Sequence, residues 1–393
     1  MKALRAICLV ASLFATSLYA QEAKPAAPRA EAIQGPSNEA QVKALQDYWT
    51  PERLAAALPM PLPRVEPRAA APDSNPPAPV EPARFAPAIL PTLHVPAEPE
   101  SRTERFPLSQ GPEVNDDAVT PDAFNYEMPF NNYRTGINNQ FPYTAMGKLF
   151  FTVPAGASEP AGGYVCSAAV AGNLHVVVTA RHCMWDYVSK KWYSNWVFYP
   201  GWNNGPDTAL GGAWYPDYAT TWTGGNVLAL NTGWDIGILT MEGATHKGCG
   251  ASGGLEIGNY TGALGYSYNG DYTQRQWNAF GYPQAAPFEG NYLYQDNGAT
   301  GAVNPYGSTN VVEIGDPQTG GTSGGPWVIS FNPNNATDPS PNNNTAPGYS
   351  NALNGVNSYV YTSPAEPYAM NGTIFQTANF YNLFESALAV KCT

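Results

Sequence analysis

Cationic side chains are scarce in this sequence. Its 393 residues include 19 Lys and Arg against 31 Asp and Glu, which gives a net charge of -12. A surface that binds nucleic acid needs clustered Lys and Arg, because phosphate contacts supply most of the affinity. We therefore expect no nucleic-acid partner and attribute the acidity to solubility.

Long apolar runs are also missing. Residues 7–14 form an early one, which follows Lys2 and Arg5 and precedes residues 18–20, Leu-Tyr-Ala. This run is too short to span a bilayer, which takes about 18 or more apolar residues, and no later segment approaches that length. A positive start, a short apolar stretch and a small residue at the end are typical of a secretory signal. We predict a signal peptide at residues 1–20, a soluble secreted protein, extracellular or periplasmic, and no membrane partner.

Cysteine is rare as well. Of the five cysteines, one lies inside the predicted signal. Export leads to an oxidising compartment, so the remaining even set is expected to form disulfides, and four cysteines permit three pairings. These four are Cys166, Cys183, Cys249 and Cys392.

Residues 21–130 lack the material for a core. Ala, Pro and Glu dominate, and few aromatic residues precede Phe106. We predict a Pro/Ala-rich propeptide or linker that is largely irregular, with two short helices at residues 38–48 and 51–58, the second capped by Thr50. Composition leaves two interpretations open: a disordered linker, or a pro-segment that inhibits the protein or assists its folding.

Residues 131–393 have a different sequence pattern, with short β-branched and aromatic runs separated by Gly, Asn, Asp and Pro. Such a pattern favours an all-β barrel or sandwich. Only residues 381–390 have helical spacing, and we predict a C-terminal helix with Asn379 as its cap. Residues 332–351 are Asn- and Pro-rich and predict a long surface loop. The predicted strands are residues 147–153, 164–170, 175–180, 196–199, 236–241, 277–282, 292–295, 326–329, 355–361 and 372–375.

Two local motifs carry chemistry. Residues 178–183, VTARHC, end a β-rich run in a His beside a Cys, and residues 319–326, TGGTSGGP, surround a Ser with Gly. A nucleophilic Ser needs such a backbone, because neighbouring N–H groups must converge where the oxyanion forms. Between the motifs, residues 233–239, GWDIGIL, place an Asp before an alternating apolar strand.

These motifs closely resemble those of the trypsin and chymotrypsin family: TARHC its TAAHC, GGTSGGP its GDSGGP, and DIGIL its DIALL-type element. Thr322 in place of the usual Asp, and the phrase GKLF at residues 147–150, resemble the bacterial glutamyl-endopeptidase branch. The resemblance implies an all-β fold of two six-stranded antiparallel β-barrels of chymotrypsin type with a C-terminal α-helix. A Pro/Ala-rich leader, residues 21–130, precedes this fold. With Thr322, activation through an ion pair between that Asp and a new N-terminus is not expected.

The resemblance also implies roles for individual residues. Ser323 Oγ would attack the scissile carbonyl, His182 would transfer the proton, and Asp235 would hold the imidazole tautomer. The backbone N–H groups of Gly321 and Ser323 would form the oxyanion hole.

A disulfide between Cys166 and Cys183 would match the family's staple next to the catalytic His. By elimination Cys249 would pair with Cys392. His246 with Cys249 is too small a set to predict a metal site, and His175 is expected to be structural.

Specificity can be predicted only in part. Pro317 stands where trypsin-like enzymes carry an Asp, and Asn357 stands where glutamyl endopeptidases place a His. We expect an apolar or small residue to be preferred, with Asp316 as an alternative selector of basic residues. The predicted substrate-binding residues are Pro317, Gln318, Thr319, Ser358, Tyr359 and Val360.

The expected function is that of a secreted serine endopeptidase that acts on polypeptides through an acyl-enzyme. We expect a monomer, no cofactor and no metal, with its own propeptide as an inhibitor. Two alternatives stay open: a catalytically inactive binding module on the same scaffold, and a peptidase that processes only its own leader.

Overall fold

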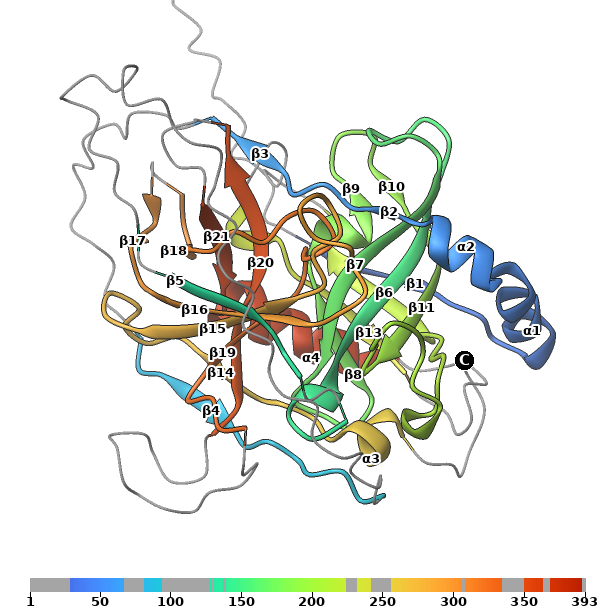
Figure 1. Ribbon diagram of the computed structural model, residues 1–393, viewed down its shortest axis with the longest axis horizontal. Coiled ribbons are helices and arrows are strands. Elements are labelled where there is room, and N and C mark those ends of the chain that lie inside the picture. Colours follow the sequence, from blue (N-terminus) through green and yellow to red (C-terminus); the bar gives the residue numbers. More distant parts are fainter. Residues whose placement is uncertain are drawn as a thin grey trace, which may run out of the picture.

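The computed structural model describes residues 29–66, 81–93, 128, 130–136, 139–223, 232–241, 256–305, 308–333, 350–362 and 368–390. The expected signal peptide and most of the predicted 332–351 loop lie outside these ranges. Within them the protein is mostly β, with two large curled sheets side by side (Figure 1). No helix of the described residues is both long and apolar enough to cross a membrane.

The first sheet follows the path β12-β13-β8-β7-β6-β11, with antiparallel pairing throughout. An isolated bridge between Phe198 in β11 and Trp214, just before β12, draws the two ends of the path together. The sheet therefore curls into a barrel whose interior is filled by buried aliphatic and aromatic side chains. Its strands are β6 (Met146–Val153), β7 (Gly162–Val170), β8 (Val176–Thr179), β11 (Ser194–Pro200), β12 (Tyr218–Trp222) and β13 (Gly237–Thr240).

The second sheet follows the path β18-β21-β20-β19-β15-β16, again antiparallel. Its end strands face each other, since a Cβ added at Gly298 in β16 would lie 3.1 Å from the Gly315 carbonyl oxygen in β18. Trp277 and Trp327 fill the interior, with ring centroids 5.4 Å apart. The strands are β15 (Gln276–Gly281), β16 (Tyr294–Ala299), β18 (Val311–Gly315), β19 (Pro326–Ile329), β20 (Ala352–Tyr361) and β21 (Ala369–Ile374), with β5 (Phe130–Arg134), β14 (Gly265–Tyr268) and β17 (Ala302–Val303) at the margins.

The predicted fold class, two antiparallel barrels and a C-terminal helix, is confirmed. The helix α4 (Asn382–Ala389) follows a π-helical turn, η8 (Thr377–Tyr381). The prediction that Asn379 caps this helix is wrong, because Asn379 lies inside the turn and donates its side-chain amide to the carbonyls of Gly233 and Ile374. This buried amide ties the C-terminal turn to the loop that precedes Asp235.

The described leader residues pack on both barrels. The two predicted helices are present as α1 (Glu39–Tyr48) and α2 (Pro51–Ala56), with Thr50 as the N-cap of α2. Short leader strands add to strands of the body: β1 to β12, β2 to β7, β3 to β20 and β4 to β14. They are β1 (Ala30–Gln34), β2 (Leu58–Pro59), β3 (Arg64–Val65) and β4 (Arg84–Ala86).

Short elements complete the described chain. Most are single turns or two-residue strands in the connections between the barrel strands. They are η2 (Tyr143–Ala145), η3 (Arg181–Cys183), β9 (Trp185–Asp186), β10 (Lys191–Trp192), η4 (Thr208–Leu210), η5 (Thr232–Trp234) and α3 (Ile257–Thr261).

Candidate active site

The imidazole of His182 is presented by a tight turn. Strand β8 ends at Thr179, and the single 3-10 turn η3 then carries His182, which is buried. A disulfide joins Cys166 in β7 to the neighbouring Cys183. This bond is the predicted one, and it fixes the turn to the sheet. The other two cysteines of the expected set, Cys249 and Cys392, lie outside the described residues.

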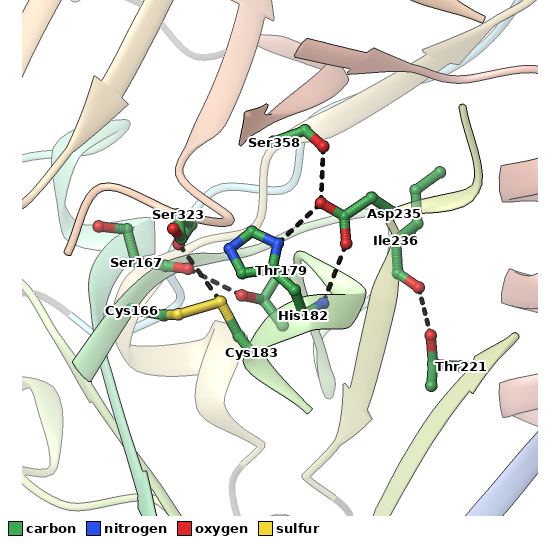
Figure 2. Close-up of polar contacts among 10 residues, drawn as sticks. All are labelled: Cys166, Ser167, Thr179, His182, Cys183, Thr221, Asp235, Ile236, Ser323 and Ser358. Atoms are coloured by element: carbon green, nitrogen blue, oxygen red, sulfur yellow. Dashed lines mark hydrogen bonds and ion pairs between the residues drawn. A yellow bond between two sulfur atoms is a disulfide. The ribbon is translucent and has the colours of Figure 1, made fainter. Parts of the chain in front are cut away.

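Asp235 lies between η5 and β13 and holds His182 at two points. One carboxylate oxygen accepts the backbone N–H of His182 at 2.9 Å, and the other lies 2.8 Å from the imidazole Nδ1. The second oxygen also accepts a hydrogen bond of 2.6 Å from the Ser358 hydroxyl. Figure 2 shows the carboxylate between these donors. The imidazole therefore has its orientation set by backbone and side-chain contacts together.

The carboxyl group of Asp235 is ionised at neutral pH although it is buried. Burial raises its pKa, but the charge of His182 and its hydrogen bond lower the pKa, as do Arg181 and the Ser358 hydroxyl. The lowering contributions win, so the pKa of Asp235 is lower than its usual value. An ionised carboxylate only accepts hydrogen bonds, so Nδ1 is the ring nitrogen that donates to Asp235, and Nε2 is left on the other side of the ring.

Ser323 lies in the loop between β18 and β19, on the side of the imidazole away from Asp235 (Figure 2). Its carbonyl oxygen accepts the Ser167 N–H at 2.8 Å and lies 3.7 Å from the Cys183 sulfur. Ser323 Oγ and His182 Nε2 are both buried, and neither has a hydrogen-bond partner within the described part of the chain. The predicted nucleophile and the predicted base thus lie on the same side of the imidazole ring, without a direct hydrogen bond between them.

Glycines on both sides of Ser323 shape this loop. Gly321 has φ 96° and Gly324 has φ 76°, in the left-handed region that other residues rarely adopt. A Cβ at Gly321 would lie 2.7 Å from the Tyr282 carbonyl oxygen. The Gly321 N–H, one of the two predicted oxyanion-hole donors, donates to the carbonyl oxygen of Met60 at 3.0 Å. A leader residue therefore occupies this donor.

A buried polar network supports the same loop, and no local sequence pattern predicted its contacts. The Asn357 side-chain amide donates to the Thr322 hydroxyl at 2.8 Å and to the carbonyls of Phe280 and Thr322. Its oxygen accepts the indole N–H of Trp327 at 2.5 Å. The Thr322 hydroxyl in turn donates to Gln318 Oε1 at 2.6 Å. Thr322 stands where trypsin-like enzymes have an Asp, and Asn357 stands where glutamyl endopeptidases have a His. The two residues are therefore partners of each other.

The predicted substrate-binding residues mostly make contacts within the protein. Gln318 accepts from Thr322, and the Thr319 hydroxyl donates to the carbonyl of Ala285 at 2.7 Å. Ser358 bonds Asp235, so its side chain supports the candidate triad. The ring of Tyr359 is buried, and Pro317 is half-buried. The Val360 N–H donates to the Pro63 carbonyl oxygen at 3.0 Å.

Asp316, the alternative selector of basic residues, is one of two buried carboxyl groups. It is 2% exposed, and Asp296 in β16 is fully buried. Burial raises the pKa of both groups, and the charge of Asp316 raises the pKa of Asp296 further. One oxygen of Asp316 accepts the Gln318 N–H at 2.8 Å. Its raised pKa makes Asp316 less ready to ionise than an exposed aspartate, so it is a weaker partner for a cationic side chain.

One group of three residues among those described has metal-ligand atoms close together: Cys166, His182 and Cys183. Both sulfurs belong to the disulfide, so they are not thiolate ligands. The other described histidine, His175, lies away from this group, with Nδ1 3.4 Å from Glu256.

Comparison with known proteins gave matches among solved structures. No family model matches the chain, and no curated protein matches it. The thermostable serine protease AL20 from an extremophilic microorganism has a TM-score of 0.49 at 26% identity, over 63% of this chain and 98% of that one. Protease Anisep from Arthrobacter nicotinovorans has 0.49 at 25% identity, over 66% and 100%. A Glu endopeptidase in complex with MPD has 0.45 at 13% identity, over 65% and 96%.

Proposed function

We propose that this chain is a secreted serine endopeptidase with a Ser323, His182 and Asp235 triad. The observation that carries the proposal is the orientation of His182. Its Nδ1 faces an ionised carboxylate at 2.8 Å, while Nε2 is free of any described partner on the side where Ser323 lies. A residue that served only to stabilise the barrel would have no need for a buried, unpaired nitrogen.

Each group has a defined task in this proposal. His182 Nε2 takes the proton of Ser323 Oγ as the hydroxyl attacks the carbonyl carbon of a peptide bond. Asp235 stabilises the imidazolium that forms, because it remains ionised in its buried position. The N–H groups of Gly321 and Ser323 donate hydrogen bonds to the carbonyl oxygen and stabilise the negative charge that develops on it. The imidazolium then returns the proton to the leaving amine, and water hydrolyses the acyl-enzyme through the same groups.

Secretion is part of the proposal. The sequence of residues 1–20 supports it, and the disulfide between Cys166 and Cys183 is of a kind that persists in an oxidising compartment. Detection of the mature protein outside the cytoplasm, with a new N-terminus near residue 21, would test this part separately.

The activity is tested by covalent labelling with a fluorophosphonate, which reacts readily with an activated serine hydroxyl and not with an ordinary one. The wild-type chain should be labelled once, at Ser323, and Ser323→Ala should not be labelled. Ser167→Ala is a matched control, because this buried serine also lies at the site but bonds the Gly321 carbonyl and the Tyr282 N–H. Labelling that persists in Ser323→Ala, or labelling of Ser167, would contradict the proposal. Profiling on a peptide library then gives the preferred residue.

A further inference from the structure

The leader segment 57–65 crosses the candidate site from one barrel to the other. Figure 1 shows this part of the chain passing from α2 and β2, beside β7, to β3, beside β20. On the first barrel, β2 pairs parallel with β7, and the Met60 N–H donates to the Val165 carbonyl oxygen at 2.9 Å. The segment therefore begins on the strand that carries the Cys166 end of the disulfide.

In the middle of the segment, a leader carbonyl contacts the nucleophile loop, which is the loop between β18 and β19 that carries Ser323. The oxygen of Met60 accepts the Gly321 N–H at 3.0 Å, which is the donor that the proposed function assigns to the oxyanion. The Gln284 side chain holds the preceding turn, since its amide donates to the Ala57 carbonyl oxygen at 2.7 Å. A substrate carbonyl cannot use the Gly321 N–H while Met60 occupies it.

On the second barrel, the segment adds to an edge of β20. The N–H groups of Val360 and Thr362 donate to the carbonyls of Pro63 and Val65, each at 3.0 Å. Val360 belongs to the predicted substrate-binding strand. Leader residues thus take main-chain partners on both sides of Ser323, as an extended peptide does when it adds a strand to a sheet.

The sequence of the segment suits this role. Proline alternates with apolar residues from Leu58 to Pro63, so φ is fixed at every second position and each preceding residue is kept extended. A segment that is already extended loses less conformational entropy when it binds. Met60 and Leu62 are buried at 5% and 7% exposure, whereas Leu58 is 53% exposed. Two side chains therefore anchor the segment and one faces away.

The helical part of the leader holds the segment in place from a distance. The Trp49 indole N–H donates to the Asn195 carbonyl oxygen at 2.7 Å, and its ring packs against Phe150 with centroids 5.8 Å apart. Strand β1 adds to β12 on the same barrel. These contacts keep residues 57–65 at a high effective concentration at the site.

We propose that residues 57–65 are an intramolecular inhibitor that occupies the main-chain peptide-binding groove of this protein. The inference rests on the proposed function and adds its regulation: the leader must be displaced before a substrate reaches Gly321 and β20. It also indicates the substrate class. The groups that the leader uses are main-chain groups, so an extended polypeptide segment is the ligand that would replace it.

The test compares the full chain with three leader variants, each verified as intact by mass spectrometry. Leu62→Asp and Met60→Gly are designed to release the segment, and Leu58→Asp is the control. Leu62→Asp places a carboxylate at a buried anchor, and Leu58→Asp makes the same change at an exposed position of the same segment. Leu62→Asp should react with a fluorophosphonate at least about tenfold faster than the wild type, because a buried unpaired charge is strongly unfavourable. Leu58→Asp should react at the wild-type rate. Met60→Gly removes a buried side chain without adding charge, and it serves if Leu62→Asp does not fold.

A synthetic peptide of residues 36–66, added in trans, completes the test. It should slow the labelling of Leu62→Asp, or of Met60→Gly where that variant is used. The same peptide carrying Leu62→Asp should not slow it. Equal labelling of the wild type and both released variants would overturn the inhibitor proposal and leave the proposed function standing. If no folded variant is labelled, the proposed function itself is overturned.

Discussion

The two barrels support the candidate site in different ways. The first barrel presents His182 through direct contacts: a disulfide beside it, and a carboxylate that bonds both its backbone and its ring. The second barrel presents Ser323 through backbone shape, with left-handed glycines on either side and a buried network behind them. The position of His182, the proposed base, therefore depends on a few strong polar contacts. The position of Ser323, the proposed nucleophile, depends on a loop conformation that many weaker contacts maintain.

The largest expected effect comes from a substitution in the first barrel, at Asp235. Asp235→Asn should lower kcat by about ten-thousand-fold, because an amide at this position no longer selects the tautomer with a basic Nε2. The measurement is steady-state hydrolysis of a peptide found by library profiling, with the leader displaced. Asp186→Asn is the control, since Asp186 is also a buried carboxylate of this barrel but bonds Ser158 and Ser189. A similar loss in both variants would argue against a catalytic role for Asp235.

The second prediction concerns the nucleophile loop. Gly321→Ala should reduce kcat/KM by about a hundredfold to a thousandfold, the loss found when an oxyanion-hole donor is removed. The added methyl would lie 2.7 Å from the Tyr282 carbonyl oxygen, so the loop must move and take the N–H with it. Gly212→Ala imposes the same strain at φ 66°, in a place where the added Cβ meets nothing within 4 Å. It should lower stability slightly and leave kcat/KM unchanged.

The sequence predicted the site residues of both barrels, but it predicted few of the contacts that hold them in place. His182, Asp235 and Ser323 lie in motifs whose spacing and neighbours are local, so sequence alone indicated them. Thr322 and Asn357 were visible only as departures from a family pattern. Their partnership depends on β20 passing behind the loop, a contact across 35 positions of the chain. No local pattern contains that information.

The leader shows the same limit. Its two helices follow from capping and proline position, which are local signals, and both are present. The contact between Met60 and Gly321 joins a carbonyl to an N–H far along the chain. Every residue carries such groups, so side-chain identity cannot predict which of them will pair. Only the fold brings those two together.

A third prediction removes part of the network behind Ser323. Thr322→Val should lower the free energy of unfolding by about 1–3 kcal/mol, because the Gln318 and Asn357 amides each lose a buried partner. Chemical denaturation gives this value. Thr273→Val, at an exposed threonine, should change stability far less. If the loss of activity exceeds the modest loss expected from a looser loop, Thr322 has a role in positioning that the buried contacts alone do not explain.

The smallest effect concerns a part of the second barrel that the mechanism does not use. Burial raises the folded-state pKa of Asp296 and Asp316 above the unfolded value, which is about 4. The folded state therefore holds more protons on these two groups, and their contribution to stability is greatest below about pH 4 and falls as the pH rises towards neutrality and beyond. Asp296→Asn replaces one of these carboxyl groups by an amide that does not ionise, so it removes that group's pH-dependent effect on stability. The variant should gain a few degrees in Tm relative to the wild type at pH 8, and little at pH 4, in thermal unfolding followed by circular dichroism. Equal gains at both pH values would mean that folding does not raise the pKa of Asp296. The second barrel would then tolerate a buried charge as well as the first does at Asp235.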